Sequence, residues 1–249
     1  FRQAMESLIV TNAHKIVNGE FPEITRTDAD FFFLERTSPF VTAKTVAELC
    51  AERLPKAYGY SPTDDIQVLC PSRKGDAGTV HINKILQAAL NPPAKHKREH
   101  SFGQCTLREG DKLMQVKNNY DIYWEKGDRD YGITNFEHGT GIFNGELGRI
   151  TLIDKEQKII EVVFDDQKKA WYSFSELDEL EHAYAITIHK AQGSEFDVGI
   201  LVVPQSSKML LTRNLLYTGM TRAKKLLIII DKCAPNRYNL VYIIQKGGL

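Results

Sequence analysis

The stretch AITIHKAQGSEFD, residues 185–197, gathers Thr, His, Lys, Ser, Glu and Asp directly before the apolar run VGILVVP. Two more polar clusters lie beside apolar runs, at Pro71–Gly78 after DIQVLC and at Tyr217–Arg222 before LLIII. The carboxyl ends of parallel strands, and the turns beside them, face the ligand crevice of an α/β sheet. We therefore expect all three clusters to lie at such an edge and to contact a ligand.

The chemistry of two residues in these clusters points to an anionic ligand. Gly193 lets the backbone approach an anion closely, because it has no Cβ. The Arg222 guanidinium can bind phosphate through its fork of donors. Simpler interpretations stay open for each residue alone, because a Thr-His pair beside a strand often makes only local hydrogen bonds and a lone arginine is often a surface charge.

The size and composition of the chain restrict its class. With 249 residues, 42% of them hydrophobic, the chain can form one large domain or two small ones. Lys+Arg and Asp+Glu balance at 32 each, so no overall basic excess indicates nucleic acid, although a local basic face is compatible with this total. No apolar run reaches the roughly 20 residues that span a bilayer, and we expect no membrane partner.

The cysteines indicate the compartment. Cys50, Cys70, Cys105 and Cys233 are widely spaced and form no C-x-x-C pair. This spacing argues against a zinc site and against a disulfide framework, and it fits a reducing cytosol. We therefore expect a cytoplasmic protein without a bound structural metal.

The order of predicted elements indicates an α/β fold with an insertion. Up to about residue 95, amphipathic helices alternate with short apolar strands, a pattern typical of a parallel sheet. From about 98 to 180 the signals are short strands and turns, which predict a small β-barrel of about 80 residues. After Leu180 the α/β pattern returns. The predicted domains are therefore 1–95 with 181–249, and an inserted 96–180.

Four segments in order resemble a known family. AYAITIHKAQGSEFD and LLYTGMTRAKKLLII closely resemble motifs V and VI of superfamily-one helicases, and within that group the RecD-like DNA helicases, the exodeoxyribonuclease V alpha-subunit family. VLCPSRKGDAGTVHINKILQAALNP and LMQVKNNYD…GIFNGELGRI are similar to segments between motifs IV and V, and FRQAMESLIVTNAHKIVNGE resembles motif IV. The resemblance implies a second RecA-like parallel-sheet lobe, with an inserted small barrel that helps to hold single-stranded DNA.

The resemblance also implies roles at a nucleotide. Arg2 and Arg222 would reach the γ-phosphate of ATP, with Arg222 acting as the arginine finger that stabilises charge on the leaving phosphoryl group. Gly193 would offer its backbone near the phosphates, and Glu195 would accept a hydrogen bond from the ribose. These roles come from the motifs and not from the spacing of the residues.

A second set of residues is expected to contact DNA. The family motif assigns Thr187 and His189 to the DNA strand. Arg73 and Lys74, in a loop with two glycines, can hold DNA phosphates, although a purely solvated loop is an equal alternative. Asn118 lies in a segment that combines charge, amides and an aromatic ring, as in single-strand binders, but aromatic residues there also suit a barrel core.

The chain contains no G-x-x-x-x-G-K-[ST] loop. The nearest string, SRKGDAGT, has the wrong spacing and ends without Lys-Thr. In the family this loop belongs to the first lobe, so we expect a fragment that lacks this N-terminal lobe and is inactive alone, with ATP and Mg²⁺ held mainly by the missing part. The missing lobe and single-stranded DNA are the implied partners, and RecB- or RecC-like subunits are compatible with the family.

These observations lead to one predicted function and two alternatives. The predicted function is the second motor lobe of an ATP-dependent DNA helicase that moves 5′ to 3′ on single-stranded DNA in repair or recombination. The first alternative is a non-catalytic DNA-binding or interaction module. The second is the helicase part of a conjugative relaxase, which shares these motifs.

Overall fold

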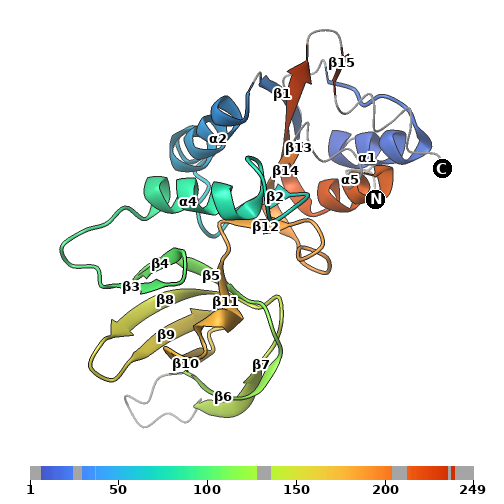
Figure 1. Cartoon of the computed structure of the whole chain (residues 1–249). Helices are drawn as coiled ribbons and strands as arrows, with labels where there is room; N and C mark the ends of the chain where they lie inside the picture. The colour runs from blue at the N-terminus through green and yellow to red at the C-terminus, as the bar shows by residue number, and fades with distance from the viewer. Residues whose placement is uncertain are drawn as a thin grey trace. The chain divides into compact units, whose positions relative to one another are not determined.

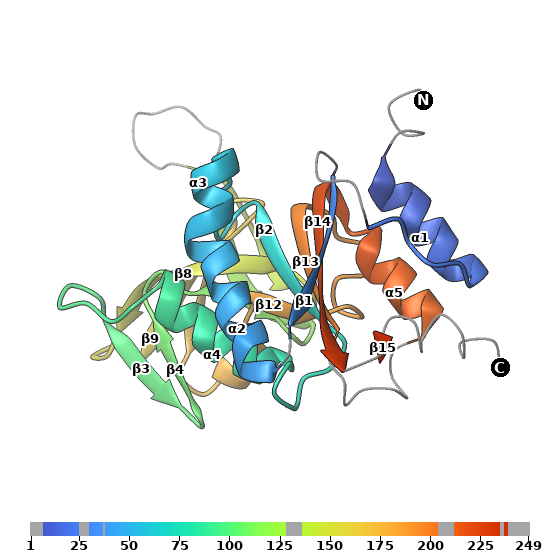
Figure 2. The same cartoon turned by 90° about the horizontal axis from the view of Figure 1, so that it is seen from above.

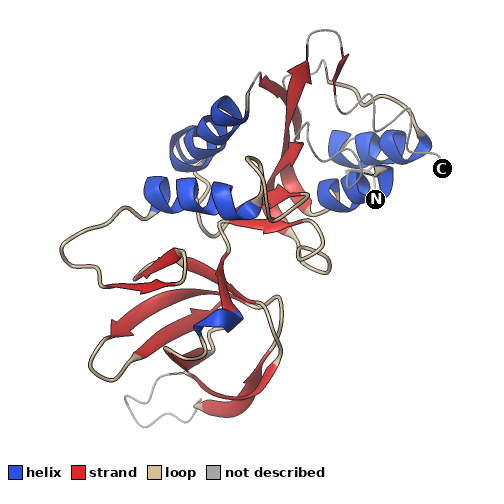
Figure 3. Ribbon diagram, in the orientation of Figure 1, coloured by secondary structure: helices blue, strands red, loops and turns tan. Residues whose placement is uncertain are grey.

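The computed structural model describes residues 7–24, 30–36, 38–127, 136–203, 212–234 and 237–238. The contacts between these residues divide the chain into two compact units. The parallel-sheet unit comprises the described residues of Phe1–Leu90 and Tyr184–Leu249, and the antiparallel unit is Asn91–Ala183 (Figures 1 and 3). The described helices include none long and apolar enough to cross a membrane.

The parallel-sheet unit is a sheet covered by helices on both faces. Its strands run in the order β1-β14-β13-β2-β12 and are parallel throughout, while β15 pairs antiparallel with the end of β14. Figure 2 shows α1 and α5 on one face of this sheet and α2 and α4 on the other. The elements in chain order are α1 (Leu8–Asn18), β1 (Phe31–Arg36), α2 (Pro39–Glu48), a π-helical turn (Leu49–Arg53), α3 (Leu54–Tyr58), β2 (Ile66–Cys70), α4 (Thr79–Leu90), β12 (Ala185–Thr187), β13 (Phe196–Val203), α5 (Arg213–Met220), β14 (Ala223–Ala234) and β15 (Arg237–Tyr238).

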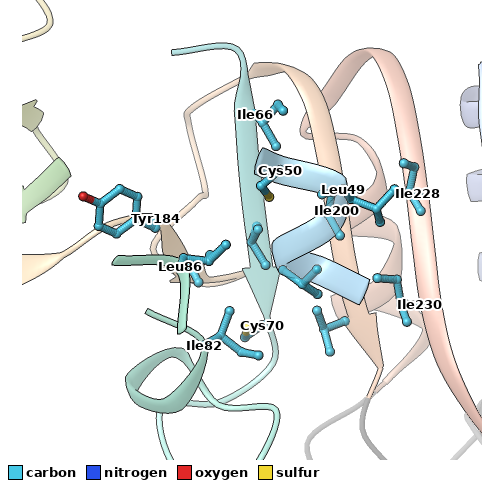
Figure 4. Close-up of a cluster of buried hydrophobic side chains, with 14 of the residues drawn as sticks. Leu49, Cys50, Ile66, Cys70, Ile82, Leu86, Tyr184, Ile200, Ile228 and Ile230 are labelled. Atoms are coloured by element: carbon cyan, nitrogen blue, oxygen red, sulfur yellow. The ribbon is translucent and has the colours of Figure 1, made fainter. Parts of the chain in front are cut away.

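Burial on both faces explains why the central strands of this sheet are mostly apolar. All five residues of β2 are buried, as expected for a central strand of a parallel sheet. Leu49 and Cys50 pack with Ile200 of β13 and with Ile228 and Ile230 of β14 in one apolar core (Figure 4). Each such aliphatic side chain contributes roughly 1.5–3 kcal/mol relative to an exposed one. The predicted parallel α/β sheet is confirmed.

The helices that flank the polar clusters have clear end signals. The Ser7 hydroxyl accepts from the Val10 N–H and begins α1, and Gly19, with φ of 83°, ends it. The Thr212 hydroxyl accepts from the Leu215 N–H at 3.2 Å and begins α5. The sequence therefore sets the position of α5, which leads directly into Arg222.

The antiparallel unit contains a seven-stranded sheet and a separate hairpin. The sheet order is β11-β5-β8-β9-β10-β6-β7, and β3 pairs only with β4. The predicted small barrel is not confirmed, because the pairings recorded for the described residues run from β11 to β7 without joining these two ends. The strands are β3 (Glu99–Phe102), β4 (Cys105–Arg108), β5 (Lys112–Gln115), β6 (Asn119–Lys126), β7 (Glu137–Ile142), β8 (Leu147–Asp154), β9 (Ile159–Phe164), β10 (Lys169–Ser173) and β11 (Leu180–His182), with a 3-10 turn at Leu177–Glu179.

A buried polar group joins the two ends of the antiparallel unit, at Asn91 and His182. The Asp111 carboxylate is fully buried; it accepts from Asn91 Nδ2 at 2.7 Å and from the Arg108 N–H at 2.8 Å, and it lies 3.0 Å from His182 Nε2. We call these four residues the Asp111 cluster. Burial alone would raise the pKa of Asp111, but the hydrogen bonds and the interaction with His182 bring this pKa below its ordinary value.

Candidate functional site

Arg222 joins the end of α5 to the turn that precedes β13. Its Nη1 donates to the Ser194 carbonyl at 3.1 Å, its Nε to the Thr218 carbonyl at 3.2 Å, and its Nη2 to the Thr221 hydroxyl at 3.2 Å. The Phe196 N–H donates back to the Arg222 carbonyl at 2.8 Å. The Arg222 side chain is half-buried. Its three acceptors, two carbonyls and a hydroxyl, are neutral and do not compensate its positive charge.

The turn beside Arg222 contains two other predicted site residues. Gly193 has φ of 88°, a conformation that favours glycine, and a Cβ built there would meet no atom within 4 Å. Glu195 is exposed. The Ser194 N–H donates to the Ala191 carbonyl at 3.1 Å, which fixes the turn between them. The structure thus brings together Gly193, Glu195 and Arg222, with open space over the glycine.

Thr187 lies at the far end of β12, next to the end of β2. Thr187 pairs with Cys70, and the Ile188 N–H donates to the Cys70 carbonyl at 3.0 Å. The Thr187 hydroxyl accepts from the Lys190 N–H at 3.3 Å, and His189 is exposed. Since the polar loop begins directly after β2, this pairing brings Thr187 and the loop to the same edge of the sheet.

The loop after β2 closes onto the first residues of α4. The Thr79 N–H donates to the Ser72 carbonyl at 3.1 Å, and the Val80 N–H to the Arg73 carbonyl at 3.2 Å. A Cβ at Gly78 would come within 2.5 Å of the Arg73 and Lys74 carbonyl oxygens, so only glycine fits. The side chains of Arg73 and Lys74 are exposed. Backbone geometry therefore holds this basic pair at the carboxyl end of β2.

The expectation that all three polar clusters share one edge of the sheet is wrong. Thr187 pairs with the last residue of β2, whereas Val198, near the start of β13, pairs with Ile66, the first residue of β2. Because β12 and β13 both run parallel to β2, the turn of residues 188–195 returns the chain to the opposite edge. Gly193, Glu195 and Arg222 therefore lie at the amino ends of the strands.

Two predicted site residues remain, Asn118 and Arg2. Asn118 belongs to the antiparallel unit, is exposed, and accepts from the Asn144 N–H at 2.9 Å through its Oδ1. Close to it in sequence, Tyr120 is 66% exposed and meets Phe143 edge-on, with 5.7 Å between ring centroids. Tyr120 is therefore a surface ring and does not lie in the core. Arg2 lies outside the described residues.

Comparisons with known proteins agree with the motifs. A model of the ATP-dependent RecD-like DNA helicase SH3 domain matches residues 82–164, and a model of the UvrD-like helicase C-terminal domain matches residues 182–230. The chain is 31% identical over 224 residues to an ATP-dependent RecD2 DNA helicase of Deinococcus radiodurans, covering 90% of this chain and 27% of the relative. The chain belongs to the RecD-like family of superfamily-one helicases.

This chain also matches about a third of another RecD relative. RecBCD enzyme subunit RecD of Buchnera aphidicola subsp. Acyrthosiphon pisum is 36% identical over 215 residues, covering 81% of this chain and 32% of that subunit. A crystal structure of Pif1 helicase from Bacteroides in complex with ADP-AlF3 and ssDNA covers 90% of this chain and 49% of that chain at 16% identity, with a TM-score of 0.47. This RecD-like chain spans about a quarter to a third of the length of the RecD relatives.

Sequence reasoning missed two buried amides that hold β12. Asn83 of α4 donates from Nδ2 to the Ala185 carbonyl at 2.8 Å and accepts from the Ala185 N–H at 2.7 Å. Gln67, fully buried in β2, donates from Nε2 to the Tyr184 carbonyl at 3.1 Å. For Asn83 the sequence offered one signal, a polar residue directly after Ile82 on the apolar side of a predicted helix.

The donor set around Arg222 fits part of a nucleotide. A guanidinium, an exposed glycine turn and an exposed carboxylate suit phosphate oxygens and a sugar hydroxyl. The described residues include no group of three or more His, Cys, Asp or Glu that could hold a metal ion. The arrangement therefore places a cation, an open glycine turn and a carboxylate close together.

Proposed function

We propose that this chain is the second motor lobe of an ATP-dependent DNA helicase, which couples ATP hydrolysis to movement along single-stranded DNA. The observation that carries the proposal is the hydrogen bond from Arg222 to the Ser194 carbonyl, because it holds a cation beside the Gly193 turn. The family assignment supports the reaction class. The lobe that carries the phosphate-binding loop would complete the site.

Arg222 has the central role at the nucleotide. Its guanidinium would leave the neutral carbonyls of Thr218 and Ser194 and stabilise the negative charge that develops as the γ-phosphoryl group transfers. Arg2 would supply a second cation. Glu195 would accept from the ribose, and the Gly193 backbone would approach the phosphates. ATP would supply the phosphoryl group, and Mg²⁺, held mainly by the other lobe, would neutralise its charge.

The opposite edge of the sheet would hold DNA. Thr187 and His189 on one strand end, and Arg73 and Lys74 on the neighbouring one, present a hydroxyl, an imidazole and two cations to a sugar-phosphate backbone. The turn of residues 188–195 joins the two edges, so a displacement at the nucleotide would move the DNA contacts. Asn118 would add a contact from the antiparallel unit, which we propose to be a small barrel.

The finer parts of the proposal follow from the family alone. Movement would run 5′ to 3′, in DNA repair or recombination in the cytoplasm. RecB- and RecC-like subunits are candidate partners. Partial DNA duplexes with a single-stranded tail at either the 5′ or the 3′ end would separate the two directions. A helicase that moves 5′ to 3′ would unwind only the duplex with the 5′ tail.

The decisive test is ATP turnover by the protein that carries this chain together with the lobe bearing the phosphate-binding loop. We expect single-stranded DNA to stimulate hydrolysis. We expect Arg222→Ala to lower kcat about 10³-fold or more, because an arginine finger contributes that much, while DNA affinity stays unchanged. The matched control is Lys225→Ala, which removes a nearby exposed cation whose Nζ lies 2.7 Å from Asp197 Oδ2 and should leave turnover normal.

Two results would contradict the proposal. Normal turnover in Arg222→Ala would remove Arg222 from the catalytic site. Absence of hydrolysis in the unsubstituted protein, with and without DNA, would favour a non-catalytic DNA-binding or interaction module. The isolated chain is expected to show no turnover in either case, because it supplies only one wall of the site.

A further inference from the structure

The strand that carries Thr187 is short and lies at the edge of its sheet. Among the residues that the structure describes, β12 pairs only with β2, over three residues, and it is last in the strand order. The free side of Ala185 is bonded instead by a side chain, the carboxamide of Asn83. Asn83 is 7% exposed, so these two hydrogen bonds are shielded from water.

A carboxamide suits this place because it offers one donor and one acceptor in a plane, as a peptide group does. Its Nδ2 and Oδ1 satisfy both the carbonyl and the N–H of Ala185, at 2.8 and 2.7 Å. An unpaired buried backbone group is costly, so without Asn83 this residue of β12 would tend to leave the sheet. Asn83 thus stands in for a further strand.

We propose that Asn83 is a positioning residue that fixes the Thr187 turn relative to the basic loop, and that this arrangement sets the affinity for single-stranded DNA. The inference rests on the proposed DNA-binding edge. Thr187 follows Ala185 by two residues, so it lies on the same face of β12. The same helix α4 that carries Asn83 also holds the loop, through the Val80 N–H bonded to the Arg73 carbonyl.

The chain contains a matched control for this contact. Asn12 of α1 makes the same two-bond pairing with Glu23, donating from Nδ2 to its carbonyl at 2.9 Å and accepting from its N–H at 2.7 Å. Asn12 is fully buried, and α1 lies on the opposite face of the sheet from α4 (Figure 2). Glu23 carries no proposed contact, so Asn12→Ala reproduces the structural loss without touching β12.

The experiment compares Asn83→Ala and Asn12→Ala in the whole 249-residue chain. Hydrogen exchange followed by mass spectrometry should show faster exchange over residues 184–188 in Asn83→Ala only. Fluorescence anisotropy with a labelled oligo-dT strand should show DNA affinity lowered about tenfold in Asn83→Ala, the size expected for two lost hydrogen bonds. Asn12→Ala should bind within a factor of about two of the unsubstituted chain.

Each outcome decides one step. Unchanged exchange over residues 184–188 would overturn the positioning role. Faster exchange with unchanged DNA affinity would overturn the link to DNA. If the unsubstituted chain binds no DNA, the proposed DNA-binding edge fails, while the exchange result still decides what Asn83 does to β12. Should Asn83→Ala not fold, Asn83→Asp keeps the side-chain volume and the acceptor but loses the donor, and should shift both measurements in the same direction.

Discussion

Two kinds of buried polar contact, one in each unit, can be compared. In the parallel-sheet unit, Asn12 and Asn83 are neutral amides that each pair with one backbone residue. In the antiparallel unit, Asp111 buries a carboxylate among an amide, an N–H group and an imidazole. A neutral pair depends little on pH or salt, whereas a buried charge depends on keeping every partner. The contacts at β12 are therefore of the kind that pH affects least.

The largest effect should come from Asp111→Ala. Removing the carboxylate takes away the buried acceptor that His182, Asn91 Nδ2 and the Arg108 N–H share, and should cost about 3–5 kcal/mol of the free energy of unfolding. Both tryptophans of the chain, Trp124 and Trp171, belong to the antiparallel unit, so tryptophan fluorescence in urea reports this unit directly. A decrease in the free energy of unfolding below about 1 kcal/mol would show that losing the buried charge costs no more than losing an amide pair.

A smaller effect should appear in the pH dependence. The pKa of Asp111 is lowered in the folded state, so its contribution is complete above the unfolded value of about 3.9 and is lost as pH falls through the lower folded pKa. The difference in urea midpoint between the unsubstituted chain and Asp111→Asn should therefore narrow below about pH 4. The deficit of Asn12→Ala, followed by circular dichroism, should not change over the same range. A difference in urea midpoint for Asp111→Asn that does not change with pH would show that the buried carboxylate is no more sensitive to pH than the amide pair.

The smallest effect should come from a charged pair on the surface. Lys117 and Asp178 form an ion pair in the antiparallel unit, with side chains 53% and 54% exposed. Water and salt screen such a pair, and holding two long side chains together has an entropic cost. Lys117→Ala should leave the urea midpoint of tryptophan fluorescence unchanged within error. A shift comparable with that of Asp111→Asn would mean that burial is not what separates the two kinds of contact.

The sequence predicts local features of this fold better than pairings between distant segments. Apolar runs predicted β2 and β13, and short strands with turns predicted the antiparallel insertion. The sequence pattern changes near residues 95 and 181, and the contacts divide the chain into two units after Leu90 and before Tyr184. Closure into a barrel was not confirmed, because the periodicity of a strand carries no information about which neighbours it joins.

The candidate site shows the same limit. The structure brings Arg222 next to the turn that contains Gly193 and Glu195, but only the register of β12 and β13 against β2 shows that Thr187 lies at the opposite edge. Asn83 was missed because an asparagine in a helical pattern does not reveal a partner 102 positions away in the chain. Both facts depend on pairings between segments that the sequence pattern leaves open.

The register across β2 also fixes how far apart the two edges are. At about 3.3 Å per residue, its five residues hold the edges about 13 Å apart. That separation exceeds the Debye length of about 8 Å at physiological ionic strength, so exposed charges on one edge are largely screened from the other. If ATP and DNA bind at these edges as proposed, communication between them must be mechanical, through the displacement of the 188–195 turn, and should persist at salt concentrations that abolish long-range electrostatics.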